Sequence, residues 1–180
     1  MPRQAAKKPA KTAVTRAGRG RRLYTLEVFL ISGPVTRRFA RKNPVIARTI
    51  QMRGDQTLEA LHHAIFEAFD REEAHWYEFQ VGGKGPMDRQ ARCYVLPGAV
   101  DAPSSDRKLA GDLTRTPMGS LGLKVGDAFG YWFDFGEDWW HQINVLAIKD
   151  AAPRGRYPRV TKRVGASPPQ YAGGDEEESG

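Results

Sequence analysis

Hydrophobic residues recur along the chain at two different periods. In residues 23–31 one face carries Tyr24, Leu26, Val28 and Leu30, and the other carries Thr25 and Glu27. This alternation is the period of a β-strand with one buried face. Residues 45–52 alternate in the same way, and we expect these two strands to pair antiparallel. Residues 58–70 instead place apolar side chains at helical spacing, after Asp55 or Thr57 as the residue that caps the first turn. The pattern therefore predicts two strands and then an amphipathic helix.

The second half of the chain is predicted to add further strands. Residues 75–81 have the pattern of a third strand, and residues 92–96 of a short fourth one. A stretch rich in Pro, Gly and Ser follows from residue 97 to about 120, and we expect it to cross the surface. Residues 127–135 and 139–148 then form two strands joined as a hairpin, which are expected to close the sheet.

These elements together predict an α+β fold with an antiparallel or mixed sheet and one main helix packed across it. Two strands, a helix and more strands resemble a ubiquitin-like ββαβ start with added strands. Residues 23–149 are expected to form this one domain. Residues 1–22 lack hydrophobic periodicity and are expected to be a disordered basic arm, and residues 150–180 a Pro- and Gly-rich extended segment with an acidic tail.

The net charge of +7 is distributed unevenly. Residues 1–22 hold eight Lys or Arg and no acidic residue, whereas residues 23–148 hold 14 basic and 16 acidic residues. A basic arm can contact nucleic acid nonspecifically by releasing counterions, or it can remain a solvated tail without a specific partner. The candidate nucleic-acid residues of the arm are Arg3, Lys7, Lys8, Lys11, Arg16, Arg19, Arg21 and Arg22.

Cysteine content and hydropathy bear on the compartment. Cys93 is the only cysteine, so no internal disulfide can form and a reducing environment is favoured. No apolar run approaches the roughly 20 residues of a membrane span, and the N-terminus lacks the apolar stretch of a secretory signal. We expect a cytoplasmic protein that does not contact membranes.

Three histidines are predicted to lie on apolar faces. His62 falls within the helix stripe, His75 shares a strand face with aromatic residues, and His141 shares one with aliphatic residues. A histidine in such a place is most often a hydrogen-bonded core residue. If the hairpin loop consists of the four residues 135–138, Asp134 and His141 share a face, and one residue more or fewer reverses that assignment.

A metal or catalytic site is the alternative for these residues. His75, His141 and Asp134 are the candidate metal ligands, because imidazole and carboxylate bind divalent metals in open catalytic sites. Asp138 is a further catalytic candidate beside them. The ligands would come from separate elements without a close spacing such as HExxH, so the interpretation as core histidines and turn acids is favoured and no cofactor is assigned.

The tryptophans of the hairpin, together with His62, are candidate binding residues. Trp132, Trp139 and Trp140 could stack nucleic-acid bases, as aromatic side chains do in proteins that bind single strands. The neighbouring acidic residues would repel phosphates, however. Core packing and a surface that faces a protein partner are the favoured alternatives.

Three segments in order resemble the plasmid pRiA4b ORF-3-like family. They are TLEALHHAI, HWYEF and YWFDFGEDWWH, which are similar to the family's TLxxLHxxI helix, HxxxF strand and YxxDFGDxWxH ending. The resemblance spans most of residues 23–149. It implies a set of shared polar residues, which are His62, His75, Asp134, Asp138 and His141.

The chain departs from the family pattern at several positions. PVIARTI corresponds to the family's PxIWRRI strand, with Ala47 in place of Trp and Thr49 in place of one Arg. In the hairpin motif, Glu137 occupies a position where Asp is common. SPPQY resembles the CPPED segment of many members, with Ser167 for Cys and Gln170 for Glu. These last two differences argue against a thiol-dependent or metal role for that segment.

The resemblance implies no established activity. Some family members are labelled putative transposon resolvases, but a serine recombinase needs an activated serine near its amino terminus, and the first serine here is Ser32. Our first hypothesis is a non-enzymatic binding or accessory domain, associated with mobile genetic elements, which engages a protein partner and contacts nucleic acid through its arm. The alternative is a metal-dependent hydrolase or nuclease that uses His75, Asp134, Asp138 and His141.

Overall fold

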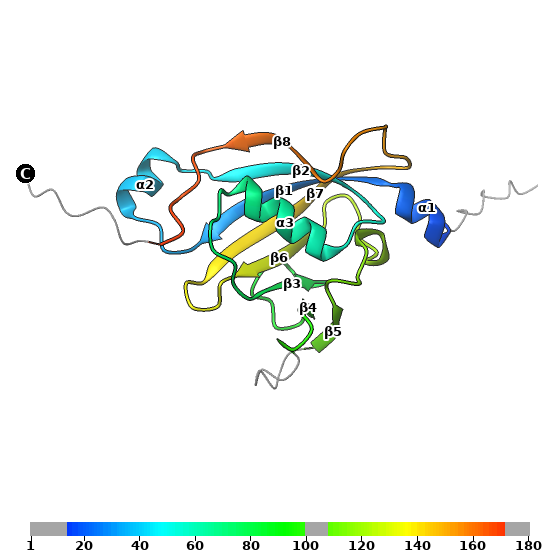
Figure 1. Cartoon of the computed structure of the whole chain (residues 1–180), viewed down its shortest axis with the longest axis horizontal. Coiled ribbons are helices and arrows are strands. Elements are labelled where there is room, and N and C mark those ends of the chain that lie inside the picture. Colours follow the sequence, from blue (N-terminus) through cyan, green and yellow to red (C-terminus); the bar gives the residue numbers. More distant parts are fainter. Residues whose placement is uncertain (1–13, 100–107, 172–180) are drawn as a thin grey trace, which may run out of the picture.

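A computed structural model describes residues 14–99 and 108–171 of the chain. Its helices and strands are α1 (Arg16–Arg21), β1 (Leu23–Ser32), α2 (Arg37–Lys42), β2 (Ala47–Arg53), α3 (Leu58–Ala68), β3 (Tyr77–Val81), β4 (Arg92–Val95), β5 (Lys108–Asp112), η2 (Met118–Ser120), β6 (Ala128–Phe133), β7 (Trp139–Lys149) and β8 (Arg159–Val164). The described strands form one eight-stranded sheet in the order β5-β4-β3-β6-β7-β1-β2-β8 (Figure 1). Every neighbouring pair is antiparallel except β4 and β5. The prediction of an α+β fold with a mixed sheet is confirmed.

The hydrophobic core lies between the sheet and α3, which crosses in front of the strands in Figure 1. Thr57 caps this helix by accepting a hydrogen bond from the amide of Ala60 at 3.3 Å. The apolar stripe of the helix is buried as its spacing predicts, and each fully buried Leu or Ile side chain contributes about 1.5–3 kcal/mol to folding. The buried residues of the helix are Leu58, Leu61, His62, Ile65 and Ala68.

The expected limits of the folded domain differ from the structure at both ends. β8 lies beyond residue 149 and pairs with β2 at the edge of the sheet, where Val160 and Val164 are its two half-buried side chains. At the other end, α1 occupies part of the arm that was expected to be disordered. Residues 1–13 and the acidic tail after residue 171 lie outside the described residues.

Two further expectations concern the stretch from residue 97 to 120 and the ubiquitin-like start. The stretch from 97 to 120 contains β5 and η2 in its described part, and residues 100–107 lie outside the description. The ubiquitin-like start is not confirmed, since both neighbours of β1 in the sheet, β2 and β7, are antiparallel to it. The description of α3 as one main helix across the sheet likewise stays a prediction.

The hairpin of β6 and β7 has a longer loop than the four residues considered from the sequence. Phe133 pairs with Trp139, so five residues form the loop. Trp132 consequently pairs with Trp140, and Tyr131 pairs with His141. Since successive side chains of a strand point to opposite faces, Tyr131, Phe133, Trp139 and His141 face the core while Trp132 and Trp140 face away from it. The condition of a four-residue loop is therefore not met, and Asp134, with a φ of 58°, lies in the loop rather than on a strand face.

A buried arginine joins the C-terminal part of the chain to the core. Arg48 on β2 is 1% exposed, and its Nε donates a hydrogen bond to the carbonyl of Ala68 at 2.7 Å. Its Nη1 donates to the carbonyls of Val164 at 2.9 Å and Gly165 at 3.1 Å, and its Nη2 donates to the Ser167 hydroxyl at 2.9 Å. One guanidinium thus connects the end of α3, the end of β8 and the segment that follows.

Replacing this arginine tests its contribution to folding. We expect Arg48→Met to lower the free energy of unfolding by about 3 kcal/mol, because the carbonyls of Val164 and Gly165 lose a donor that they share. Arg53→Met, on the same strand, is the matched control: Arg53 is exposed and pairs with Asp55 at 2.8 Å, so we expect a loss below about 1 kcal/mol. Urea unfolding followed by circular dichroism measures both, and equal losses would contradict the assignment.

Candidate functional site

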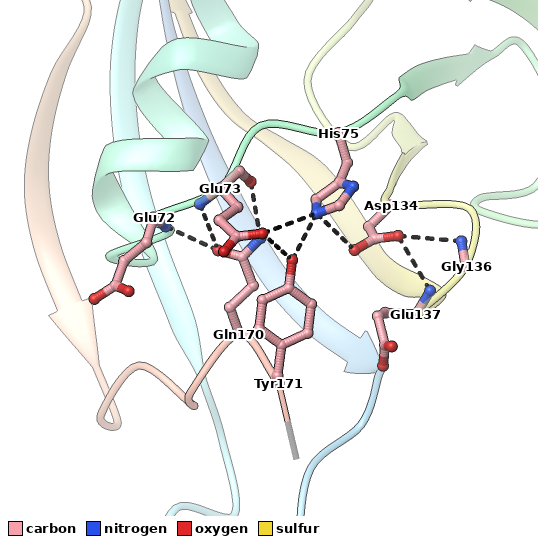
Figure 2. A network of polar contacts seen from close by, with 8 residues as sticks. All are labelled: Glu72, Glu73, His75, Asp134, Gly136, Glu137, Gln170 and Tyr171. Atoms are coloured by element: carbon pink, nitrogen blue, oxygen red, sulfur yellow. Dashed lines mark hydrogen bonds and ion pairs between the residues drawn. The ribbon is translucent and has the colours of Figure 1, made fainter. Parts of the chain in front are cut away.

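A network of polar side chains surrounds His75, in the loop between α3 and β3 (Figure 2). The Nε2 atom of His75 lies 2.7 Å from the hydroxyl of Tyr171 and 3.4 Å from Oδ2 of Asp134. Oε2 of Glu73 lies 4.0 Å from the same nitrogen. Three segments that are distant in sequence therefore meet at this imidazole: its own loop, the β6–β7 loop and the C-terminal segment.

Asp134 fixes the shape of the β6–β7 loop. Its backbone has a φ of 58°, in the left-handed region that Asp and Asn adopt more readily than most residues. Its Oδ1 accepts hydrogen bonds from the amides of Gly136 at 3.1 Å and Glu137 at 3.2 Å, and its carbonyl accepts from the Asp138 amide at 2.7 Å. The buried Oδ2 has no hydrogen-bond partner at normal distance, so its approach to His75 is an electrostatic contact.

The C-terminal segment is held by the side chains of Gln170 and Tyr171. The amide oxygen of Gln170 accepts from the backbone of Glu72 at 2.8 Å and of Glu73 at 3.0 Å, and its amide nitrogen donates to the Glu73 carbonyl at 2.8 Å (Figure 2). A glutamate at position 170 could accept but could not donate, so glutamine suits this contact. The hydrogen bond from Tyr171 to the Glu73 carboxylate, 2.7 Å long, is the main cause that raises the pKa of Tyr171 to about 12.

The geometry at His75 differs from that of a proton relay. In a Ser-His-Asp triad the nucleophile and the carboxylate hold opposite nitrogens of the imidazole. Here Tyr171, Asp134 and Glu73 all approach the same nitrogen, Nε2 (Figure 2). The raised pKa of Tyr171 also disfavours a phenolate nucleophile near neutral pH. This arrangement suits a structural connection between the C-terminal segment and the two loops better than a catalytic relay. We call its residues, Glu73, His75, Asp134, Gln170 and Tyr171, the latch.

The other two predicted histidines lie in the core, each in an aromatic environment. The Nδ1 atom of His62 is 2.7 Å from the hydroxyl of Tyr131, and its ring stacks on Tyr77 with 3.5 Å between centroids. The ring of His141 lies 5.1 Å from Tyr131 and 5.1 Å from Phe69. Burial is the main cause that lowers the pKa of each histidine to about 3, and both are therefore neutral at pH 7.

The proposed catalytic and metal-binding cluster is assembled only in part. His75 and Asp134 meet, but His141 is enclosed in the core, and Asp138 instead accepts a hydrogen bond from Nε1 of Trp132 at 2.9 Å. Within residues 14–99 and 108–171, no three His, Cys, Asp or Glu side chains are placed to share a metal ion.

The three tryptophans also divide between two environments. Trp139 is fully buried, so it cannot serve as part of an exposed binding surface. A Cβ atom on Gly33 would lie 2.3 Å from its indole ring, which shows how closely the backbone packs on it. Trp132 and Trp140 stack on the outer face of the sheet, with centroids 4.6 Å apart and planes at 8°. Only these two of the proposed tryptophans are available to a partner.

Sequence patterns did not indicate Arg71, which lies directly after the turn that ends α3. It is 7% exposed, and its guanidinium carbon lies 3.7 Å above the ring of Trp139. Burial is the main cause that lowers the pKa of Arg71 to about 10, so it remains charged at pH 7. Its charge in turn contributes to the lowered pKa of His141. A single charged residue in a polar turn carries no pattern from which this burial could be predicted.

The candidate nucleic-acid residues of the arm are described only from residue 14 onward. Arg16, Arg19 and Arg21 lie on α1, which packs beside η2. Arg19 donates a hydrogen bond to the carbonyl of Val14, and Arg22 lies 3.9 Å from the carboxylate of Asp150. The remaining candidates, Arg3, Lys7, Lys8 and Lys11, lie outside the described residues.

Comparison with known proteins agrees with the motifs that surround this site. The model of the plasmid pRiA4b ORF-3-like protein family matches residues 38–177. The chain belongs to this family. The match extends through β8 to the segment of Gln170 and Tyr171, both of which lie beyond the expected domain of residues 23–149.

A solved structure shares the fold of this pRiA4b ORF-3-like protein. It is the crystal structure of MM3350, a protein of unknown function from Methanosarcina mazei Go1, with a TM-score of 0.62 and 23% sequence identity. The similarity covers 85% of this chain and 75% of that one. None of the curated proteins matches the chain. The helices in the described part of the chain are too short or too polar to cross a membrane.

The neutral core histidines predict a specific pH dependence of stability. Their pKa values of about 3 in the folded protein lie below the ordinary value of 6.5, so the unfolded chain takes up more protons between these limits. Stability is therefore highest above pH 6.5 and falls as the pH drops toward 3. Between pH 7 and pH 5 we expect each buried histidine to account for about 2 kcal/mol of the loss.

The variant His62→Gln isolates this effect from other ionisations. Between pH 7 and pH 5 its free energy of unfolding should fall by about 2 kcal/mol less than that of the wild type. This difference does not depend on how stable the variant is at pH 7. His63→Gln, its exposed neighbour on α3, should change the dependence much less, because burial and not His63 is the main cause of the lowered pKa of His62. Urea unfolding at both pH values measures the difference, and identical slopes for the two variants would refute the neutral state of His62.

Proposed function

We propose that this protein is a non-enzymatic binding domain that contacts nucleic acid through a basic edge formed by α2 and β8. The observation that carries this proposal is the division of charge within the folded part of the chain. Residues 28–54 contain six basic and no acidic residues, and residues 151–171 contain five basic and no acidic residues. Residues 55–148, between them, contain 8 basic and 15 acidic residues.

The two basic segments adjoin each other because β2 pairs with β8. The amide of Ala166, just after β8, donates to the side chain of Asn43 at the end of α2, at 2.8 Å. Ten of the eleven basic residues are exposed, and the exception is Arg48. The exposed residues are Arg37, Arg38, Arg41, Lys42, Arg53, Arg154, Arg156, Arg159, Lys162 and Arg163.

An exposed row of lysines and arginines has two possible uses at the edge of a sheet. It can prevent the open edge from pairing with other chains, and it can bind phosphates through counterion release. Charge on β8 alone would serve the first purpose. Phosphate binding is favoured because α2 adds four more exposed basic side chains near the end of β8. A helix has no open edge to protect.

The basic arm and the family fit the same proposal. The arm of residues 1–22 would add nonspecific attraction to phosphates, which increases the rate of association. The family takes its description from a plasmid reading frame, which supports an accessory role in mobile DNA. A metal-dependent hydrolase is the weaker alternative, since His75 and Asp134 meet on a single ring nitrogen and His141 lies apart from them.

Charge reversal on the edge tests this function. We expect Arg38→Glu together with Lys162→Glu to weaken binding to a short mixed-sequence DNA duplex. The slope of log affinity against log salt should fall by about 2, one for each lost phosphate contact. Fluorescence anisotropy of the full-length protein at several salt concentrations measures both quantities. Neither side chain makes a contact that the fold requires, since both are exposed.

The matched control reverses the same number of charges elsewhere. Lys84 and Lys124 are exposed and lie in the acidic part of the chain. Lys84→Glu with Lys124→Glu should weaken the affinity by about threefold at most, which is roughly the effect of the changed net charge alone. Equal losses in the two double variants would refute a localised basic edge, as would binding that depends on residues 1–13 alone.

A further inference from the structure

The outer side of the β6–β7 hairpin carries exposed aromatic side chains that the core does not use. Trp76 is 51% exposed and Phe135 is 38% exposed, whereas Trp132 and Trp140 are half-buried. The carbonyl of Trp76 accepts a hydrogen bond from the amide of Asp134 at 2.9 Å, so Trp76 lies beside the β6–β7 loop. We call these four residues, with the loop acids Glu137 and Asp138, the hairpin face.

Three of the four aromatic rings of the hairpin face, those of Trp132, Phe135 and Trp140, are held in defined positions. Trp132 and Trp140 are direct neighbours on paired strands and stack almost in parallel. Phe135 folds back from the loop, with its ring centroid 4.2 Å from that of Trp132. Asp138 accepts the hydrogen bond of the Trp132 indole at 2.9 Å. Such a rigid aromatic surface loses little conformational entropy when it binds a partner.

The charge of the hairpin is uniformly negative. Residues 127–148 contain four acidic residues and no lysine or arginine. Glu137 and Asp138 are exposed at the loop, and the backbone hydrogen bonds to Asp134 keep that loop in place. Aromatic faces attract cations through their quadrupole, and neighbouring carboxylates add direct attraction. Nucleic acid is repelled by the same charges.

We propose that the hairpin face binds a lysine- and arginine-rich segment of a separate protein partner. The charge complementarity decides the occupant: the rings supply cation–π and apolar contacts, and Glu137 and Asp138 pair with the cationic side chains. This surface lies on the hairpin, whereas the basic edge is made by α2 and β8, so one molecule can hold both partners. The inference goes beyond the proposed nucleic-acid binding and does not depend on it.

Titration of the full-length protein with an arginine-rich peptide tests the proposal. Binding should change the tryptophan fluorescence at moderate salt, and a glutamate-rich peptide of equal length should not. We expect Trp76→Ala to weaken the affinity about tenfold, because exposed tryptophans dominate such interfaces. Asp138→Asn should weaken it about threefold to fivefold, since it removes the charge but keeps an acceptor for Trp132 and tolerates the φ of 57°.

The controls separate this surface from the rest of the molecule. Val125→Ala changes an apolar side chain that is 60% exposed outside the hairpin face, and it should leave peptide affinity unchanged. Trp76→Ala should leave DNA affinity unchanged, so failure of one proposal does not imply failure of the other. Equal affinity for both peptides, or no effect of Trp76→Ala and Asp138→Asn, would refute the hairpin face. Self-association at low salt that Trp76→Ala abolishes would assign it to a second copy of the chain and overturn a separate partner.

Discussion

The Arg48 guanidinium is the contact that holds the end of β8 and the segment after it against the core. It donates hydrogen bonds to the carbonyl of Ala68 at the end of α3 and to the carbonyls of Val164 and Gly165 where β8 ends. Its position above the ring of Phe69, at 4.9 Å, adds a cation–π contact inside the core. Without this group, the carbonyls of Val164 and Gly165 would lose a shared donor, while the carbonyl of Ala68 would keep only Nη1 of Arg163. The end of β8 and the segment that leads to Gln170 and Tyr171 are therefore held against the core at this point.

The latch shows why a polar cluster with a histidine need not be catalytic. His75 receives its contacts at one nitrogen, and Gln170 uses every polar atom of its side chain on the backbone of the neighbouring loop. Such bonds determine where a segment lies, because donors and acceptors must match in number and direction. A proton relay instead requires groups with different roles at different atoms. In this chain, the contacts of His75, Gln170 and Tyr171 connect the C-terminal segment to the loop before β3.

Local patterns were sufficient to predict most elements but not their limits. The alternation in residues 23–31 and the stripe of α3 follow from burial of a single face, which any sheet and helix must provide. β8 was missed because only Val160 and Val164 mark its inner side, and its exposed residues have the composition of a tail. Arg48 and Arg71 were missed for a related reason: a buried charge depends on partners that are distant in sequence. Tyr171 likewise acquires its role only from Glu73 and His75.

The five-residue loop between β6 and β7 also restricts how this sequence can evolve. A deletion or insertion of one residue there would rotate one strand relative to the other, bringing Trp140 inward and sending His141 to the solvent. Single substitutions on the hairpin cost at most a few contacts, whereas a change of length inverts a whole strand. Gaps in this loop should therefore be rare among related chains, even where the side chains around it differ.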